Sequence, residues 1–143
     1  MSAACLNFDD LIEINKPQVA EFHRLAELFP DASLPNACAT FSRQVRLVEG
    51  LLVQTYGIAT KLTKGIEDLS EIAEMWKDMA LFCNLVLQTI SSLRERFPYC
   101  GTSELYDLAL DYKLACDKRY RGVLQELSCQ TIEFPKGLLP ELS

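Results

Sequence analysis

Apolar residues recur from Leu69 to Phe97 in steps that alternate strictly between three and four positions. This is the heptad spacing of an α-helix that buries one face against other helices. Ala73, Ala80 and Leu87 widen the apolar stripe, so we expect a central helix that contacts more than one neighbour. The stripe itself consists of Leu69, Ile72, Trp76, Met79, Cys83, Val86, Ile90, Leu93 and Phe97.

Proline positions divide the rest of the chain, because proline is excluded from helix interiors. No proline lies between Pro35 and Pro98, or between Pro98 and Pro135. We therefore predict an all-α fold, an antiparallel up-and-down bundle of four main helices with the C-terminal tail packed on it. The predicted helices span about 15–29, 34–64, 67–97 and 103–128.

The predicted helix ends rest on capping residues and on one glycine. Asn15 and Ser33 are the expected N-caps of the first two helices, each with a proline in the following turn. Gly65 is expected to end the second helix and open a hairpin. The alternative is one continuous helix over 34–97, because a single glycine costs a helix only about 1 kcal/mol. The apolar tail residues expected to pack on the bundle are Ile132, Phe134, Leu138 and Leu139.

Composition limits the class of protein. A chain of 143 residues that is 49% hydrophobic fits a single domain over 1–143, and a net charge of −6 argues against nucleic-acid binding. The longest uncharged run, 79–93, is shorter than the ~20 apolar residues that a membrane span needs. The start of the chain has no signal-peptide pattern, and the six cysteines have no CxxC spacing. We therefore expect reduced thiols and a cytoplasmic protein.

Carboxylates at two places have a spacing that can hold Mg²⁺ against a phosphate. Glu71 and Glu74 form one pair, and Glu104 and Asp107 form the other. The spacing resembles the ExxE and ExxD pattern of the all-α nucleoside triphosphate pyrophosphohydrolases, the MazG-like family. That resemblance implies nucleotide hydrolysis with these four residues as metal ligands. The alternative is a solvated acidic face, because antiparallel helices would hold the two pairs about 30 Å apart.

Two glycines mark a candidate interface. Gly50 and Gly57 share one heptad position, opposite the apolar seam of their helix, and Val53 lies beside them. Together they cost the helix about 2 kcal/mol relative to alanine. Close approach of another backbone would offset that cost, as in a dimer face or a groove. The alternative is that another helix of the same bundle packs on the glycines.

Four arginines gather at one end of the predicted bundle: Arg43, Arg46, Arg94 and Arg96. Such a group can bind an anion or a phosphorylated partner. The alternative is a salt-bridge network with nearby glutamates.

His23 is the only histidine of the chain, which excludes the di-iron sites that helical bundles often hold. The sequence contains no convergent set of catalytic groups, and we expect no metal or other cofactor. The leading hypothesis is a non-enzymatic protein–protein interaction module, a homodimer or the binder of another protein. The alternatives are the Mg²⁺-dependent hydrolase and a bundle that binds a small apolar ligand in its core.

Overall fold

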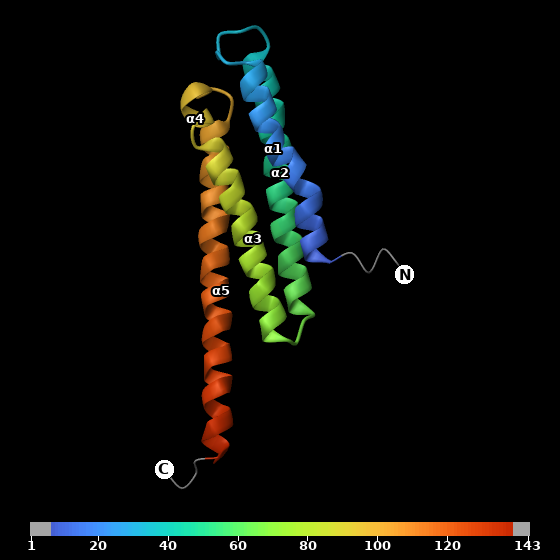
Figure 1. The fold of residues 1–143 in the computed structure, drawn as a ribbon, viewed down its shortest axis with the longest axis vertical. Coiled ribbons are helices and arrows are strands. Elements are labelled where there is room, and N and C mark those ends of the chain that lie inside the picture. The colour runs from blue at the N-terminus through green and yellow to red at the C-terminus, as the bar shows by residue number, and fades with distance from the viewer. Residues whose placement is uncertain (1–6, 139–143) are drawn as a thin grey trace, which may run out of the picture.

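The structure, a computed structural model, describes the backbone of residues 7–138 and the side chains of residues 7–129. This part of the chain is helical and contains no strand, as the sequence predicts. The long helices run antiparallel in an elongated bundle (Figure 1). The helices are α1 (Phe8–Leu28), α2 (Ala37–Lys64), α3 (Leu69–Ile90), α4 (Leu93–Arg96) and α5 (Thr102–Leu138).

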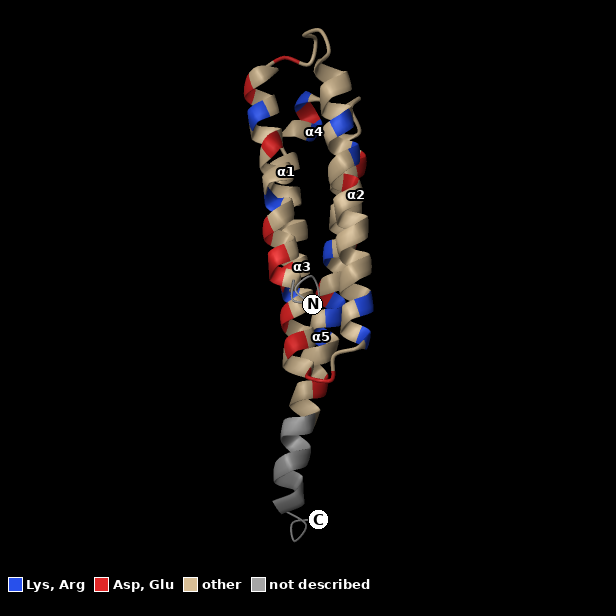
Figure 2. Ribbon diagram, turned by 90° about the vertical axis from the view of Figure 1, so that its right-hand side faces the viewer, with Lys and Arg blue, Asp and Glu red and all other residues tan. Residues whose placement is uncertain are grey.

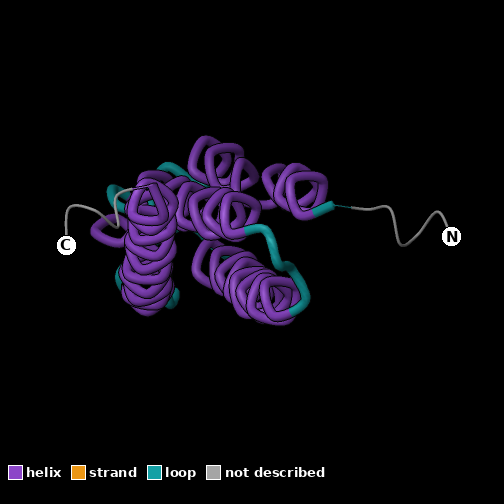
Figure 3. Tube along the Cα trace, turned by 90° about the horizontal axis from the view of Figure 1, so that it is seen from below, coloured by secondary structure: helices purple, strands orange, loops and turns teal. Residues whose placement is uncertain are grey.

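Helix α3 lies at the centre of the bundle (Figure 3) and contacts α1, α2 and α5. The middle of its predicted stripe is fully covered, with Met79, Cys83 and Ile90 each 0% exposed. Leu69 and Ile72, at the open end of the stripe, are only partly buried. The wide apolar stripe predicted a central helix with several neighbours, and three helices pack around α3.

The chain turns between α2 and α3, so the hairpin is confirmed and the continuous helix over 34–97 is wrong. Gly65 ends α2, and its N–H donates to the carbonyl of Leu62 at 3.0 Å. Asp68 then caps α3, accepting a hydrogen bond from the N–H of Ser70 at 2.9 Å. The heptad pattern continues through residue 65, but the glycine that ends α2 and the new N-cap that follows it separate the two helices.

Helix α1 begins earlier than predicted, because Asn7 and not Asn15 is its N-cap. The Asn7 side chain accepts a hydrogen bond from the N–H of Asp10 at 2.8 Å. Pro17 lies inside the helix, and Asn15 is buried in its middle. The Asn15 amide donates to the Thr55 hydroxyl on α2 at 3.1 Å. A polar pair in the core thus occupies the position where the sequence indicated a helix start.

Helix α2 starts at Ala37 rather than residue 34, and Ser33 does not cap it. The N–H of Ser33 donates instead to the Asp31 side chain at 2.9 Å, which closes a turn before the helix. Asn36 is the N-cap and has a φ of 67°, the left-handed conformation that asparagine tolerates. The apolar seam of α2 is buried from Phe41 to Ala59 and exposed at both ends, at Cys38 and Leu62.

The predicted third helix is broken near its end. Helix α3 stops at Ile90, and the short helix α4 follows. At this end the Ser91 N–H still donates to the carbonyl of Leu87 at 3.0 Å, and the Ser91 hydroxyl donates to the carbonyl of Gln88 at 3.2 Å. Leu93 and Phe97 nevertheless stay buried, so the break redirects the chain without removing the stripe from the core.

Helix α5 runs from Thr102 to Leu138, past the predicted end at residue 128. The buried Thr102 hydroxyl donates to the carbonyl of Phe97 at 2.8 Å and ties the start of α5 to the preceding turn. The sequence placed the end before Pro135, but the backbone stays helical through it. The predicted packing of the tail side chains from Ile132 onwards lies outside the described residues.

Candidate functional site

The side of α2 that faces away from the bundle is the candidate site. Helix α2 packs against α1, α3 and α5 through its buried seam, and the opposite side is exposed along its length. Leu47 is 44% exposed and Val53 is 50% exposed, both large fractions for apolar side chains within a long helix. We call this side the α2 outer face and define it by Arg43, Arg46, Leu47, Gly50, Val53, Gly57, Lys61 and Lys64.

The two glycines of the α2 outer face are uncovered. A Cβ atom added to Gly50 or to Gly57 would meet no atom within 4 Å. No helix within residues 7–129 therefore packs on them, and the interpretation that the bundle itself covers this stripe is wrong. Gly50, Gly57 and Val53 lie together on one open surface, as the heptad position predicts.

Basic residues lie at both ends of the α2 outer face. Figure 2 shows Lys and Arg near the start and near the end of α2, with an uncharged stretch between them. Arg43 and Arg46 form the first group, and Lys61 and Lys64 lie in the last turn. The only acid nearby on α2 is Glu49, whose pKa is raised by partial burial and by Glu104. The face is therefore apolar at its centre and carries basic residues at both ends, with Glu49 and Glu104 next to Arg46 at the first end.

Two of the four arginines of the predicted anion site have partners within the fold. The Arg94 guanidinium stacks over the Tyr106 ring at 3.8 Å. Arg96 donates to the carbonyls of Ala26 and Pro30 at 3.3 and 3.1 Å, at the end of α1. Arg94 and Arg96 therefore serve contacts within the fold, while Arg43 and Arg46 remain exposed on the α2 outer face.

The predicted metal ligands lie at opposite ends of the bundle. Glu71 and Glu74 are near the start of α3, whereas Glu104 and Asp107 are near the start of the antiparallel α5 (Figure 1). The length of α3 separates the two pairs by roughly 25 Å at 1.5 Å per residue. Within the described residues no group of three or more His, Cys, Asp or Glu could hold a metal ion. One copy of the chain does not assemble these four carboxylates into a site.

Aromatic residues at the middle of the bundle pack on one another. Tyr56 stacks on Tyr112 with 4.6 Å between ring centres and lies 5.7 Å from Trp76. Arg119 covers the group, since its Nε donates to the Tyr56 hydroxyl at 3.1 Å and its guanidinium lies 4.9 Å from the Trp76 ring centre. This cluster joins α2, α3 and α5. The single histidine, His23, lies elsewhere, exposed on α1.

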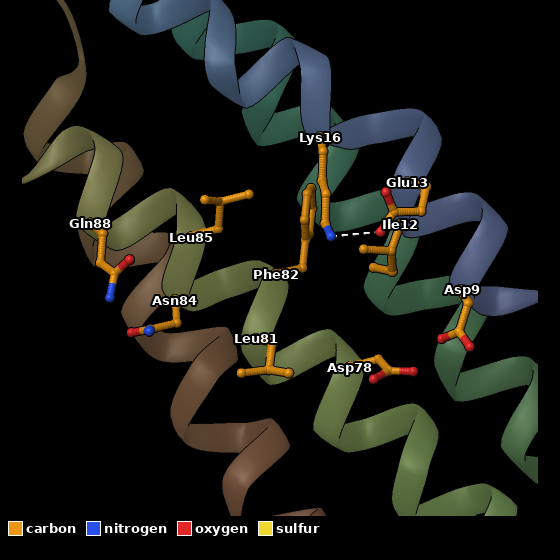
Figure 4. A pocket seen from close by; sticks show the side chains of 10 residues that line it. All are labelled: Asp9, Ile12, Glu13, Lys16, Asp78, Leu81, Phe82, Asn84, Leu85 and Gln88. Carbon is orange, nitrogen blue, oxygen red and sulfur yellow. Dashed lines mark hydrogen bonds and ion pairs between the residues drawn. The ribbon is translucent and has the colours of Figure 1, made fainter.

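A groove of about 370 Å³ runs between α1 and α3. Ile12, Phe82 and Leu85 form its apolar lining, and Lys16 pairs with Glu13 at its rim (Figure 4). Asp9 from α1 and Asp78 from α3 lie near each other at one end. Sequence reasoning missed this pair, because no local pattern relates residues so far apart in the chain.

Asp78 is an unusual acid. Partial burial, a hydrogen bond with Asp9 and the nearby charges of Asp9 and Glu74 raise its pKa to about 7, although Lys77 opposes the shift. The Asp78 carboxyl therefore holds its proton more tightly than an ordinary aspartate does.

We expect the free energy of unfolding to fall as the pH rises from about 4 to about 7. A raised pKa means that the folded state holds the proton more tightly than the unfolded chain, so the stabilisation exists at low pH and is lost at neutral pH. After allowance for solvent screening, the change amounts to about 1 kcal/mol. Urea titrations of the protein and of Asp78→Asn across this range measure it. Equal slopes for both proteins would show that Asp78 has an ordinary pKa.

Comparison with protein families, with curated proteins and with solved structures finds no match to this chain. None of the described helices combines the length and the apolar character that a membrane crossing requires. A function must therefore be argued from the surface of the bundle itself.

Proposed function

We propose that this protein is a non-enzymatic interaction module that binds a partner helix along the α2 outer face. The observation that carries the proposal is the open stripe at Gly50, Val53 and Gly57. Exposed apolar side chains flank two bare stretches of backbone, and no described helix covers them. A second helix can approach closely where side chains are absent, as helices do at small-residue interfaces.

Charge favours one kind of partner. Arg43 and Arg46 at one end and Lys61 and Lys64 at the other would face a bound helix from both sides of its apolar contact. A helix with small residues at its centre and acidic residues at both ends complements this pattern. We therefore propose that an acidic amphipathic helix of another protein binds the α2 outer face.

A second copy of the chain, the homodimer expected from the sequence, fits less well. If two α2 helices pair antiparallel with Gly50 opposite Gly57, Arg43 lies opposite Lys64 and Arg46 lies opposite Lys61. Parallel pairing sets each basic residue against its own copy. Like charges face each other in both arrangements, and each such pair opposes association.

Binding of designed peptides tests the proposal. The probe is a fluorescent helical peptide of about 22 residues, which matches the ~32 Å from Arg43 to Lys64. Its centre is alanine and leucine, and its end turns carry glutamate. We expect saturable binding by fluorescence anisotropy that weakens with added salt. A matched peptide with lysine in place of each glutamate should bind at least about tenfold more weakly.

Two variants locate the binding surface. Val53→Glu should weaken binding of the acidic peptide at least about tenfold, because it sets a carboxylate in the apolar centre of the face. Leu114→Glu is the matched control, since Leu114 is 56% exposed but lies on α5. Equal binding by both variants would overturn the proposal. Sedimentation of the protein alone that shows a dimer lost in Val53→Glu would assign the face to a second copy.

We expect Gly50→Ala and Gly57→Ala to stabilise the fold and weaken the interface. Each should raise the free energy of unfolding by about 0.5–1 kcal/mol, because the new methyl group meets no neighbour and alanine favours the helix. Urea unfolding measures this gain. The matched control is Gly122→Ala in α5, another glycine with open space, which should stabilise equally and leave peptide affinity unchanged. A loss of affinity in all three variants would argue against close approach at α2.

A further inference from the structure

Two cysteines from distant parts of the chain meet at the end of the bundle where α2 begins. Cys38 lies in the first turn of α2, and Cys100 lies in the turn between α4 and α5. The Cys38 thiol donates to the carbonyl of Tyr99 at 3.3 Å, and the Ser42 hydroxyl donates to the carbonyl of Cys100 at 3.4 Å. These two hydrogen bonds hold the turn against α2 with the cysteines next to each other.

The two thiols have complementary surroundings. Cys38 is exposed, whereas Cys100 is buried with 3% of its surface exposed. Burial and a hydrogen bond with the Cys38 thiol raise the pKa of Cys100 to about 12. A reagent in solution therefore reaches Cys38 first, and Cys100 is a protonated thiol beside it.

The turn that carries Cys100 faces solvent on its outer side. Tyr99 is 92% exposed, so its side chain does not anchor the outer side of the turn. Gly101 follows with a φ of 82°, a conformation that lets the chain reverse sharply into α5.

We propose that Cys38 and Cys100 are a dithiol that a low-molecular-weight disulfide converts into an intramolecular disulfide. The Cys38 thiolate attacks one sulfur of the small disulfide, a mixed disulfide forms, and one small thiolate leaves and takes up a proton. The Cys100 thiolate then attacks the Cys38 sulfur, and the second small thiolate leaves in the same way. The protein loses two protons and two electrons, and the small disulfide takes them up and becomes two thiols.

A second pair of thiols supplies an internal control. Cys83 on α3 and Cys116 on α5 are also hydrogen-bonded neighbours, and burial with this contact raises the pKa of Cys83 strongly. Both residues are 0% exposed, so no reagent reaches them in the folded protein. The proposal therefore predicts oxidation of one pair and protection of the other.

Peptide mapping tests the proposal on the full chain. The folded protein is incubated with glutathione disulfide, all free thiols are then blocked with N-ethylmaleimide in denaturant, and trypsin digestion proceeds without reduction. Each of the six cysteines falls in a different tryptic peptide. We expect mass spectrometry to find peptide 25–43 linked to peptide 97–113, with peptides 78–94 and 114–118 carrying only the blocking group.

Single substitutions separate the two steps. Cys100→Ala should stop at glutathione bound to peptide 25–43, and Cys38→Ser should give no linked peptide and no glutathione on peptide 97–113. Circular dichroism checks that each variant is folded. A stable glutathione adduct on Cys38 of the unaltered protein, without a linked peptide, would overturn the proposal. Linkage of 78–94 to 114–118 at the same rate would do so as well, because it would show that the folded bundle does not direct the reaction.

Discussion

Phe41→Ala should lower the free energy of unfolding by about 3–5 kcal/mol, one of the largest losses a single substitution can cause here. Phe41 is 0% exposed and lies between two other buried phenylalanines. Its ring centre is 3.9 Å from that of Phe97 and 6.3 Å from that of Phe22. Removing the ring leaves a cavity between α1, α2 and the end of α4, and helices held by several neighbours cannot collapse to fill it.

Urea unfolding followed by circular dichroism measures the loss at Phe41. Phe41→Leu, which fills most of the cavity, should cost no more than about 1.5 kcal/mol. Tyr99→Ala is the matched aromatic control, because Tyr99 is 92% exposed and its removal should change stability by no more than about 0.5 kcal/mol. A loss below about 1 kcal/mol for Phe41→Ala would mean that this end of the bundle is loosely packed.

The centre of each long helix could be predicted from the sequence, because burial there follows the heptad pattern. The stripe of α3 from Trp76 to Ile90 is buried, and Gly65 marks the turn before it. The ends could not be predicted in the same way. Asn15 has the residue type of a cap, but an earlier asparagine, Asn7, takes that role and frees Asn15 for the core. Helix α3 ends at Ile90 inside an unbroken apolar pattern, so the pattern alone does not mark this end.

The candidate surfaces that lie on one helix could be predicted from the sequence, whereas those that join two elements could not. The α2 outer face could be predicted, because Gly50, Val53 and Gly57 lie on one helix and their phase alone sets them opposite the seam. The pairs Asp9–Asp78 and Cys38–Cys100 could not, since each joins two elements whose contact depends on the folded arrangement. The partners of Arg94 and Arg96 could not be predicted for a related reason, because only the tertiary structure brings a tyrosine ring and two carbonyls at the end of α1 near them.

The Asn15–Thr55 hydrogen bond should produce an asymmetric pair of losses. The Thr55 hydroxyl accepts from the Asn15 amide and also donates to the carbonyl of Leu51. Thr55→Val leaves the buried amide without its partner, which should cost about 1–3 kcal/mol. Asn15→Leu should cost less, because the Thr55 hydroxyl keeps its bond to Leu51 and an apolar side chain suits the site.

The double variant decides whether this bond contributes to stability or only to the fit of α1 on α2. If the loss in Thr55→Val comes from the stranded amide, adding Asn15→Leu should recover at least about 1 kcal/mol. Asn15 and Thr55 are 6% and 1% exposed, so water cannot replace the missing partner. Urea titrations of the four proteins give the coupling free energy, and additive losses would show that the two residues act independently. If the double variant regains its stability but the NMR signals of α1 broaden, the hydrogen bond serves to fix the position of α1 on α2. The reason is that an apolar contact allows more than one register, whereas a hydrogen bond allows one.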